Sequence, residues 1–136
     1  MAQLSEHFSH AEAQCKCGCK MPADVRRNAE ILAEHLEVIR LDLGKPLIIT
    51  SWYRCPKRNA EVGGARKSIH LSGLAVDIKC GGFNGPEIAA RIERLIKDER
   101  IPDGGLGVYA NFPAMCHFDV RTVAGKPRAR WSKGDE

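Results

Sequence analysis

Two stretches of the chain carry hydrophobic residues at the spacing of a helix. Between residues 22 and 43, apolar positions recur every three or four residues, at Val25, Ala29, Leu32, Leu36, Ile39 and Leu43. After the turn residues 81–86, they recur at Ile88, Ile92, Leu95 and Ile96. Each set lies on one helix face, so we predict two amphipathic helices, each with one buried side. Pro22 suits the first turn of the first helix, and Gly44 suits its C-terminal end.

Other runs have the pattern of strands. Residues 47–50 are apolar and mostly β-branched, as in a buried strand. Residues 75–80 begin with the alternating run Ala75-Val76-Asp77-Ile78, which indicates a half-buried strand. Residues 107–109 and 114–120 flank a turn at 111–113, which predicts a hairpin. Residues 55–67 are rich in charge and glycine and show no period, so we expect a loop there. Because strands and helices do not alternate regularly, we predict an α+β fold with a small, mainly antiparallel sheet that carries the functional site on one face and two helices on the other.

Length and composition fit one small domain over residues 1–136, since 43% of the residues are hydrophobic. Residues 1–7 contain no basic stretch followed by an apolar run, so we expect synthesis in the cytoplasm without a secretory signal and without a membrane span. The net charge of +4 is consistent with an anionic partner, either nucleic acid or a cell-wall polymer, and equally with a solvated surface that carries a mild excess of charge. The basic tail 126–131 is too short to indicate nucleic-acid binding, and we expect Trp131 to fold back on the sheet.

Two histidines and an aspartate have the spacing of a metal site. Gly73 supplies a turn between His70 and the strand that carries Asp77, so the carboxylate can approach the imidazole. His117 lies on a second strand, on the same face as Asp119, because side chains alternate. Three nitrogen and oxygen ligands leave the fourth tetrahedral position of Zn²⁺ to water, as in a catalytic zinc site. We therefore expect one catalytic zinc ion at His70, Asp77 and His117.

A cysteine-rich segment precedes the first long helix. Cys15, Cys17 and Cys19 stand at alternate positions, and three further cysteines follow at 55, 80 and 116. The three early thiols can bind a second metal or form disulfides with the later ones, but the spacing is not C-x-x-C and a fourth ligand is not evident. In a chain without an export signal, reduced thiols are the default. We favour a structural role, in which the cluster pins the N-terminal loop.

The motif Ser68-x-His70-x-x-Gly73-x-Ala75-x-Asp77, followed by His117, resembles the zinc D-alanyl-D-alanine peptidases. This hedgehog-like group includes peptidoglycan carboxypeptidases and phage L-alanyl-D-glutamate endolysins. The similarity covers most of the chain, since it extends to the segments 50–54, 59, 63–64 and 105–109.

The resemblance implies roles for further residues. Arg54 matches a family arginine that binds substrate and stabilises the transition state. Many relatives place an acidic residue three positions before the last zinc histidine, where this chain has Ala114. The nearest candidate for the general base is therefore Asp119, as in the branch that reads His-x-Asp. Ser68 and Tyr109 are further candidates for orienting ligands or binding substrate.

Together these features predict a monomeric zinc metallopeptidase that hydrolyses peptide bonds in peptidoglycan stem peptides. The bond is of the D-Ala-D-Ala carboxypeptidase or L-Ala-D-Glu endopeptidase type. A small, basic chain without a signal favours a phage or prophage lysis enzyme, which acts on the cell wall after release. The alternative is a zinc-stabilised domain that binds cell wall or protein without turnover. Neither interpretation involves a nucleic-acid partner.

Overall fold

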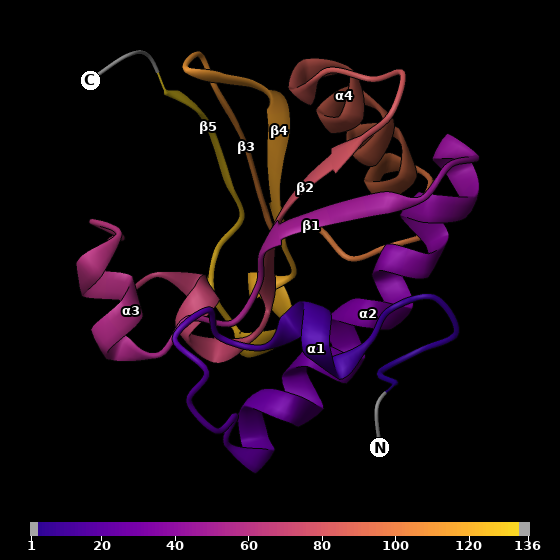
Figure 1. Ribbon diagram of the computed structural model, residues 1–136. Coiled ribbons are helices and arrows are strands. Elements are labelled where there is room, and N and C mark those ends of the chain that lie inside the picture. Colours follow the sequence, from indigo (N-terminus) through magenta and orange to yellow (C-terminus); the bar gives the residue numbers. More distant parts are fainter. Residues whose placement is uncertain (1–2, 134–136) are drawn as a thin grey trace.

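Five strands form one sheet at the centre of the computed structural model, which describes residues 3–133 (Figure 1). The strands are β1 (Leu47–Ser51), β2 (Ala75–Cys80), β3 (Gly105–Tyr109), β4 (Phe112–Asp119) and β5 (Ala129–Lys133). They follow the spatial order β1-β2-β4-β3-β5. The pairs β1–β2, β2–β4 and β3–β4 are antiparallel, whereas β5 runs parallel to β3. The α+β class is therefore confirmed, but the sheet is mixed, and the prediction of a mainly antiparallel sheet needs this correction.

The two predicted helices are present as α2 (Ala23–Leu43) and α4 (Gly85–Lys97). Pro22 is the N-cap of α2, and Gly44 ends the helix in the left-handed conformation, with φ of 74°. The short helix α1 (His10–Ala13) begins at a capping box in which Ser9 and Glu12 bond each other's backbone amides. Within residues 3–133, no helix combines the length and the apolar character needed to cross a membrane.

The segment predicted as a loop, residues 55–67, contains the short helix α3 (Pro56–Glu61), so that prediction was wrong in part. Pro56 fits the first turn of a helix, and the sulfur of Cys55 accepts a hydrogen bond from the amide of Arg58 at the N-cap position. A thiol is not among the usual N-cap groups, so Pro56 was the single local sign of a helix start in this segment. Two 3-10 turns complete the secondary structure, η1 (Ile69–Ser72) and η2 (Arg121–Ala124).

Helix α4 packs against β3 and β4, and α2 contacts α4 (Figure 1). The core under these helices contains fully buried residues of both helices and the central strands: Leu32, Leu36, Ile39, Val76, Ile78, Ile88, Ile92 and Phe118. Trp52 closes the core at the end of β1, where its indole N–H donates to the carbonyl of Gly73 at 2.9 Å. The even-numbered residues Val76, Ile78 and Phe118 face this core. Because side chains alternate along a strand, the odd-numbered residues of β2 and β4 point to the other face of the sheet.

An ion-pair network ties β5 to α4 and to the turn before β3. Arg130 donates to Glu93 at 2.7 Å and to Asp103 at 2.8 Å, and it also bonds the carbonyl of Gly104. These bonds from Arg130 hold the pKa of Glu93 below its ordinary value of 4.5. Partial burial acts in the opposite direction on Asp103, but bonds from Arg130, the Gly104 amide and Arg128 outweigh it and hold its pKa below 3.8.

Candidate metal centre and cationic cavity

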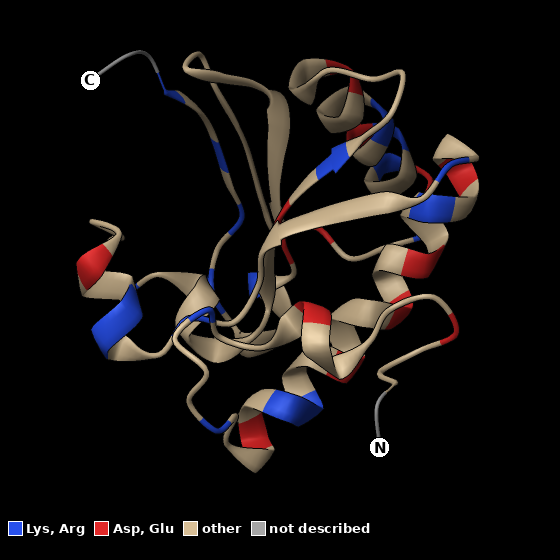
Figure 2. Ribbon diagram, viewed as in Figure 1, with Lys and Arg blue, Asp and Glu red and all other residues tan. Residues whose placement is uncertain are grey.

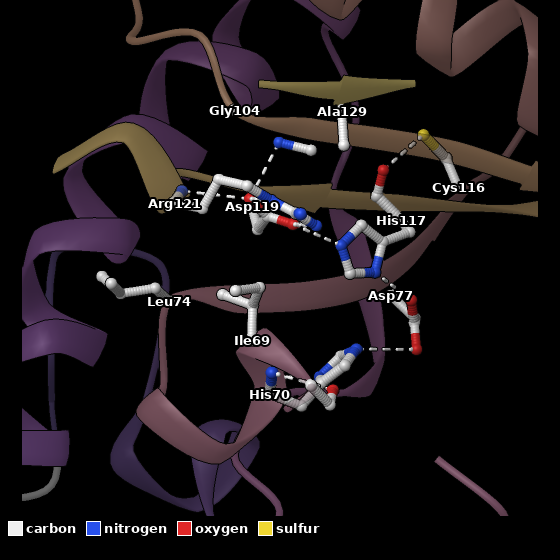
Figure 3. Close-up of polar contacts among 12 residues, drawn as sticks. Ile69, His70, Leu74, Asp77, Gly104, Cys116, His117, Asp119, Arg121 and Ala129 are labelled. Atoms are coloured by element: carbon white, nitrogen blue, oxygen red, sulfur yellow. Dashed lines mark hydrogen bonds and ion pairs between the residues drawn. The ribbon is translucent and has the colours of Figure 1, made fainter. Parts of the chain in front are cut away.

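The strand register brings two of the three predicted metal ligands together. Asp77 of β2 stands directly opposite His117 of β4 in the antiparallel ladder, and Asp77 Oδ1 lies 3.2 Å from His117 Nδ1. His70 comes from η1, and the chain then turns at Gly73, as predicted, to enter β2. This turn places His70 Nε2 3.3 Å from Asp77 Oδ2 (Figure 3). The three side chains are buried and converge on one point.

His70 carries a buried nitrogen without a hydrogen-bond partner. Its Nδ1 lies 2.7 Å from the carbonyl oxygen of Trp52, which can only accept, so Nδ1 carries the proton. Nε2 then presents a lone pair, and among the described residues it has no hydrogen-bond donor. Its neighbour at 3.3 Å is a carboxylate oxygen of Asp77, which is another acceptor. Two buried acceptors that face each other are unfavourable unless a proton or a cation lies between them.

His117 is held between two carboxylates. Its Nε2 lies 2.7 Å from Asp119 Oδ2, on the side of the ring opposite Asp77 (Figure 3). Asp119 is fully buried and accepts from the amide of Gly105 and from the amide and guanidinium of Arg121, the last at 2.8 and 2.9 Å. A carboxylate with only acceptor capacity fixes the proton on Nε2. The Nδ1 lone pair is thereby directed at the point where His70 and Asp77 meet.

The protonation states support a cation site. Burial alone would raise the pKa of Asp77, but the adjacent imidazoles of His117 and His70 outweigh it and hold the pKa well below its ordinary value. At Asp119, burial is likewise outweighed by bonds from His117 and Arg121, and its pKa is also lowered. Burial would lower the pKa of His117, yet the two carboxylates raise it. Both acids are therefore ionised, and negative charge concentrates around the histidines.

The donor set fits zinc. Nitrogen and oxygen ligands bind Zn²⁺ at about 2.0–2.1 Å, which places two ligands of a tetrahedral ion roughly 3.3–3.4 Å apart. The two contacts to Asp77 measure 3.3 Å from His70 to Oδ2 and 3.2 Å from His117 to Oδ1, and one ligand atom from each of the three residues lies within 4.8 Å of the others. His70 Nε2, an Asp77 oxygen and His117 Nδ1 would hold the ion. Trp52 and Asp119 are the groups that orient the two rings from behind.

A cavity of about 330 Å³ opens onto the two histidines. Its wall includes four cationic side chains, which are Arg54, Lys67, Arg121 and Lys133. Of the residues that the structure describes, no Asp or Glu belongs to this wall, and Asp77 borders a neighbouring hollow instead. Figure 2 shows that Lys and Arg recur along β5, which contributes to the cavity. The positive wall favours an anionic ligand.

Arg54 in the wall of this cavity is held by two uncharged hydrogen-bond partners and a longer ion pair. Its Nη1 donates to Asn59 Oδ1 at 3.0 Å, and its Nε donates to Ser51 Oγ at 3.3 Å. Nη2 lies 3.8 Å from Asp77 Oδ2. Asn59 is itself fixed by a bond from its amide nitrogen to the carbonyl of Ala65. The guanidinium is therefore positioned beside the metal ligands.

Two further predicted residues also line the cavity. Burial, reinforced by the charge of Asp77, raises the pKa of Tyr109 to about 12, so its phenol keeps its proton at neutral pH. Ser68 also lines the cavity, but its hydroxyl accepts from the amide of His70 at 3.2 Å and caps η1. Ser68 therefore positions the turn that carries His70.

Trp131 covers His117 on the cavity side. The ring centroids are 4.6 Å apart, and the guanidinium carbon of Arg121 lies 5.6 Å from the centroid of the Trp131 ring. Gly107 makes room for this ring, because a Cβ atom there would lie 2.2 Å from Trp131 Cε2. The expectation that Trp131 folds back on the sheet is met by its place in β5. Its contact with His117 was not predicted, since the pairing of β5 with β3 leaves no local pattern in the sequence.

Arg121 and Lys67 are cavity residues that the sequence did not single out. For Arg121, a signal was present, because His117, Asp119 and Arg121 alternate and can therefore share one side of the chain. Lys67 lies in an irregular segment, and only the folded chain brings it to the cavity. The predicted residues Arg54, Ser68, His70, Tyr109 and His117 all line the same space, whereas Asp119 lies behind it.

A mixed sheet that brings His70, Asp77 and His117 together beside an open cavity forms a candidate mononuclear metal centre of the hydrolytic kind. The family model described as Peptidase M15 matches residues 6–119, and the chain belongs to that family. Membership confirms the resemblance noted in the sequence and implies a zinc-dependent metallopeptidase. A comparison with curated proteins found no match.

Proposed function

We propose that this chain is a zinc metallopeptidase that hydrolyses a peptide bond in peptidoglycan stem peptides. The observation that carries the proposal is the unpartnered Nε2 of His70, which faces Asp77 and His117 at the mouth of a cationic cavity. Stem peptides carry free carboxylates, so their charge complements this wall. The D-Ala-D-Ala carboxypeptidase and L-Ala-D-Glu endopeptidase reactions both fit. A phage or prophage lysis enzyme that reaches the cell wall after release is the setting we propose.

Zinc, when bound by the triad, supplies a Lewis acid for the scissile carbonyl and lowers the pKa of a water to about 7. Groups of the chain itself would bind and orient the substrate. The Arg54 guanidinium is placed to bind a substrate carboxylate or carbonyl through paired hydrogen bonds. Tyr109, which stays protonated, is placed to donate a hydrogen bond to the same substrate. Ser68 supports the turn beneath them.

Asp119 was predicted to be the general base, and its surroundings favour a different role. Its carboxylate is fully buried and bonds His117, Gly105 and Arg121. A base must reach the proton that it removes, directly or through one water. We therefore propose that Asp119 orients His117 and increases its basicity, which is how carboxylates behind metal-bound histidines act.

One observation favours a second candidate, a zinc-stabilised domain that binds cell wall without turnover. Among the described residues, no acidic side chain belongs to the cavity wall, so no carboxylate base is evident there. Such a domain would use the same cationic cavity for recognition alone.

The two candidates differ in the products formed from purified muropeptides. Zinc-loaded protein is incubated with them, and the fragments are identified by mass spectrometry. Loss of the terminal D-alanine indicates a carboxypeptidase, and separation of L-alanine from D-glutamate indicates an endopeptidase. Intact muropeptides that remain bound to the protein would support the binding domain and refute the enzyme.

A pair of arginine variants tests the cavity. Arg54→Lys keeps the charge but loses the two-pronged donor geometry, so kcat/KM should fall by roughly 10²-fold or more. Arg94→Lys, on the exposed side of α4, is the matched control and should leave the rate unchanged. Equal rates for both variants would remove Arg54 from the substrate site.

A further inference from the structure

Four cysteine sulfurs gather at a place separate from the His/Asp/His triad. Cys15, Cys17 and Cys19 come from the segment between α1 and α2, and Cys55 comes from the N-cap of α3. Their Sγ atoms all lie within 4.8 Å of one another. Cys15 Sγ is 3.3 Å from Cys17 Sγ, which in turn is 3.5 Å from Cys55 Sγ. The fourth member, Cys55, is the one that the local sequence pattern did not identify.

The backbone of the first segment is folded to aim its sulfurs inward. In an extended strand, residues two apart are separated by about 6.6 Å, which keeps their side chains from converging. Here the amide of Gly18 bonds the carbonyl of Cys15 at 3.0 Å and closes a turn. Gly18 has φ of +82°, a conformation that residues with a side chain rarely adopt. The turn therefore curls the chain around one point.

The sulfur spacing suits a metal better than it suits disulfides. A disulfide joins sulfurs at about 2.05 Å, and all six cysteines are free. A tetrahedral Zn²⁺ with Zn–S bonds of about 2.3 Å places its sulfurs roughly 3.8 Å apart, which is slightly longer than the contacts of 3.3 and 3.5 Å and within the 4.8 Å that bounds all four sulfurs. Two of the sulfurs also accept backbone hydrogen bonds, Cys15 from the amide of Cys55 and Cys55 from the amide of Arg58, both at 3.4 Å. Amide donors of this kind stabilise a charged thiolate.

We propose that Cys15, Cys17, Cys19 and Cys55 bind a second zinc ion, in a closed, structural site. On binding, each thiol becomes a thiolate and releases its proton to water, so no oxidant or reductant is involved. Four thiolates around Zn²⁺ leave a net negative charge, and Lys16 and Lys20 flank the cysteines in the sequence. Four protein ligands leave no open position for water, which distinguishes this site from the triad.

The cluster lies where a metal ion would connect the N-terminal segment to the part of the chain that carries Arg54. Cys55 directly follows Arg54, and the amide of Tyr53 bonds the carbonyl of Ala13 at 3.1 Å. The metal would add a second and stronger tie between the N-terminal segment and the chain that carries Arg54. It would thereby fix the start of α3 and the edge of the cationic cavity. This inference goes beyond the proposed peptidase activity and does not depend on it.

The test is metal content, measured by mass spectrometry on protein purified under reducing conditions with zinc. We expect Cys17→Ser/Cys55→Ser to lose one zinc ion per chain relative to the wild type, and His70→Ala to lose the other. Cys80→Ser, at a buried cysteine outside the cluster, is the matched control and should keep both ions. A cysteine double variant with the same zinc content as the wild type would overturn the proposal. Loss in the cysteine variant together with retention in His70→Ala would refute the triad and leave the cluster standing.

A second measurement needs no variant, in case the double variant does not fold. In wild-type protein reloaded with Co²⁺, thiolate ligands produce intense sulfur-to-metal charge-transfer absorption, whereas the nitrogen and oxygen triad does not. Such absorption supports the site, and its absence in cobalt-loaded protein would refute it. Thiol titration of the denatured, chelated protein should find all six cysteines, and a deficit of four would show two disulfides instead.

Discussion

Replacing Asp119 by Asn separates the two roles considered for this carboxylate. Asparagine has nearly the same shape, and its single amide oxygen can still accept from Nε2 of His117 at the Oδ2 position, while its NH2 group takes the Oδ1 position that faces the amide of Gly105. What is lost is the negative charge that both His117 and Arg121 face. Fold and cavity shape should therefore survive, while the ligand strength of His117 falls.

The magnitude follows from these contacts. Removing a carboxylate that supports a metal-bound histidine typically costs 10–100-fold in metal affinity, or about 1.4–2.7 kcal/mol. Breaking a fully buried ion pair costs about 3–5 kcal/mol. The side chain of Arg121 is 19% exposed and can reach water, so we expect a smaller loss of about 2 kcal/mol in the free energy of unfolding of the metal-free protein.

Zinc affinity is measured by competition with a chelator, and muropeptide cleavage is measured on the same zinc-saturated sample. Asp103→Asn is the matched control. It also removes a carboxylate charge that contacts arginines at 2.8 Å, namely Arg128 and Arg130, but it does not contact the triad. It should leave zinc affinity unchanged. If Asp119→Asn keeps full zinc affinity while turnover falls by roughly 10²–10⁴, Asp119 is the general base, and the orienting role is refuted. If neither quantity changes, Asp119 has no part in the site.

Three further predictions concern the scaffold. Leu36→Ala should lower the free energy of unfolding in urea by about 2–5 kcal/mol, because the side chain is fully buried beneath the sheet; a smaller loss would mean that the core collapses around the gap. Gly107→Ala should push the Trp131 indole off the histidine at a cost of about 1–3 kcal/mol, seen as lower stability and altered tryptophan fluorescence; unchanged emission would contradict the close contact. Arg130→Met should cost about 1 kcal/mol at neutral pH. Since both carboxylate partners have lowered pKa values in the folded state, that cost is fully present above their ordinary values of 4.5 and 3.8. It should be lost progressively as the pH falls from there through the lower pKa values of the folded state, which unfolding curves near neutral and acidic pH will show.

The triad was accessible to sequence reasoning because each ligand sits in a local pattern. His70 and Asp77 flank a turn at Gly73, and alternation puts His117 on a definite face of its strand. The two long helices were accessible for the same reason, since the period of their apolar residues determines the buried side. In each case a short segment contains all the information needed.

The rest depends on contacts between distant segments. Cys55 joins the early cysteines only because the chain after β1 returns to the end of α1, where Tyr53 bonds Ala13. The direction of β5 depends on how η2 reverses the chain after β4, and nothing within residues 129–133 encodes a parallel partner. The fully buried state of Asp119 depends in turn on Arg121 folding back over it. These are tertiary effects, for which single-sequence patterns have no signal.

The place of β4 in the sheet affects when this centre can form during translation. β4 lies between β2 and β3 in the sheet, yet it is synthesised after both. Asp77 of β2 therefore has no contact with His117 of β4 until a segment about forty residues later has emerged. Trp131 arrives later still. A nascent chain that has exposed only the first two ligands holds an incomplete centre with unpaired strand edges, which are the features that promote misassembly. Metal capture at the triad is therefore expected only after β4 has emerged, and a ribosome-bound chain stopped before β4 should take up no zinc there.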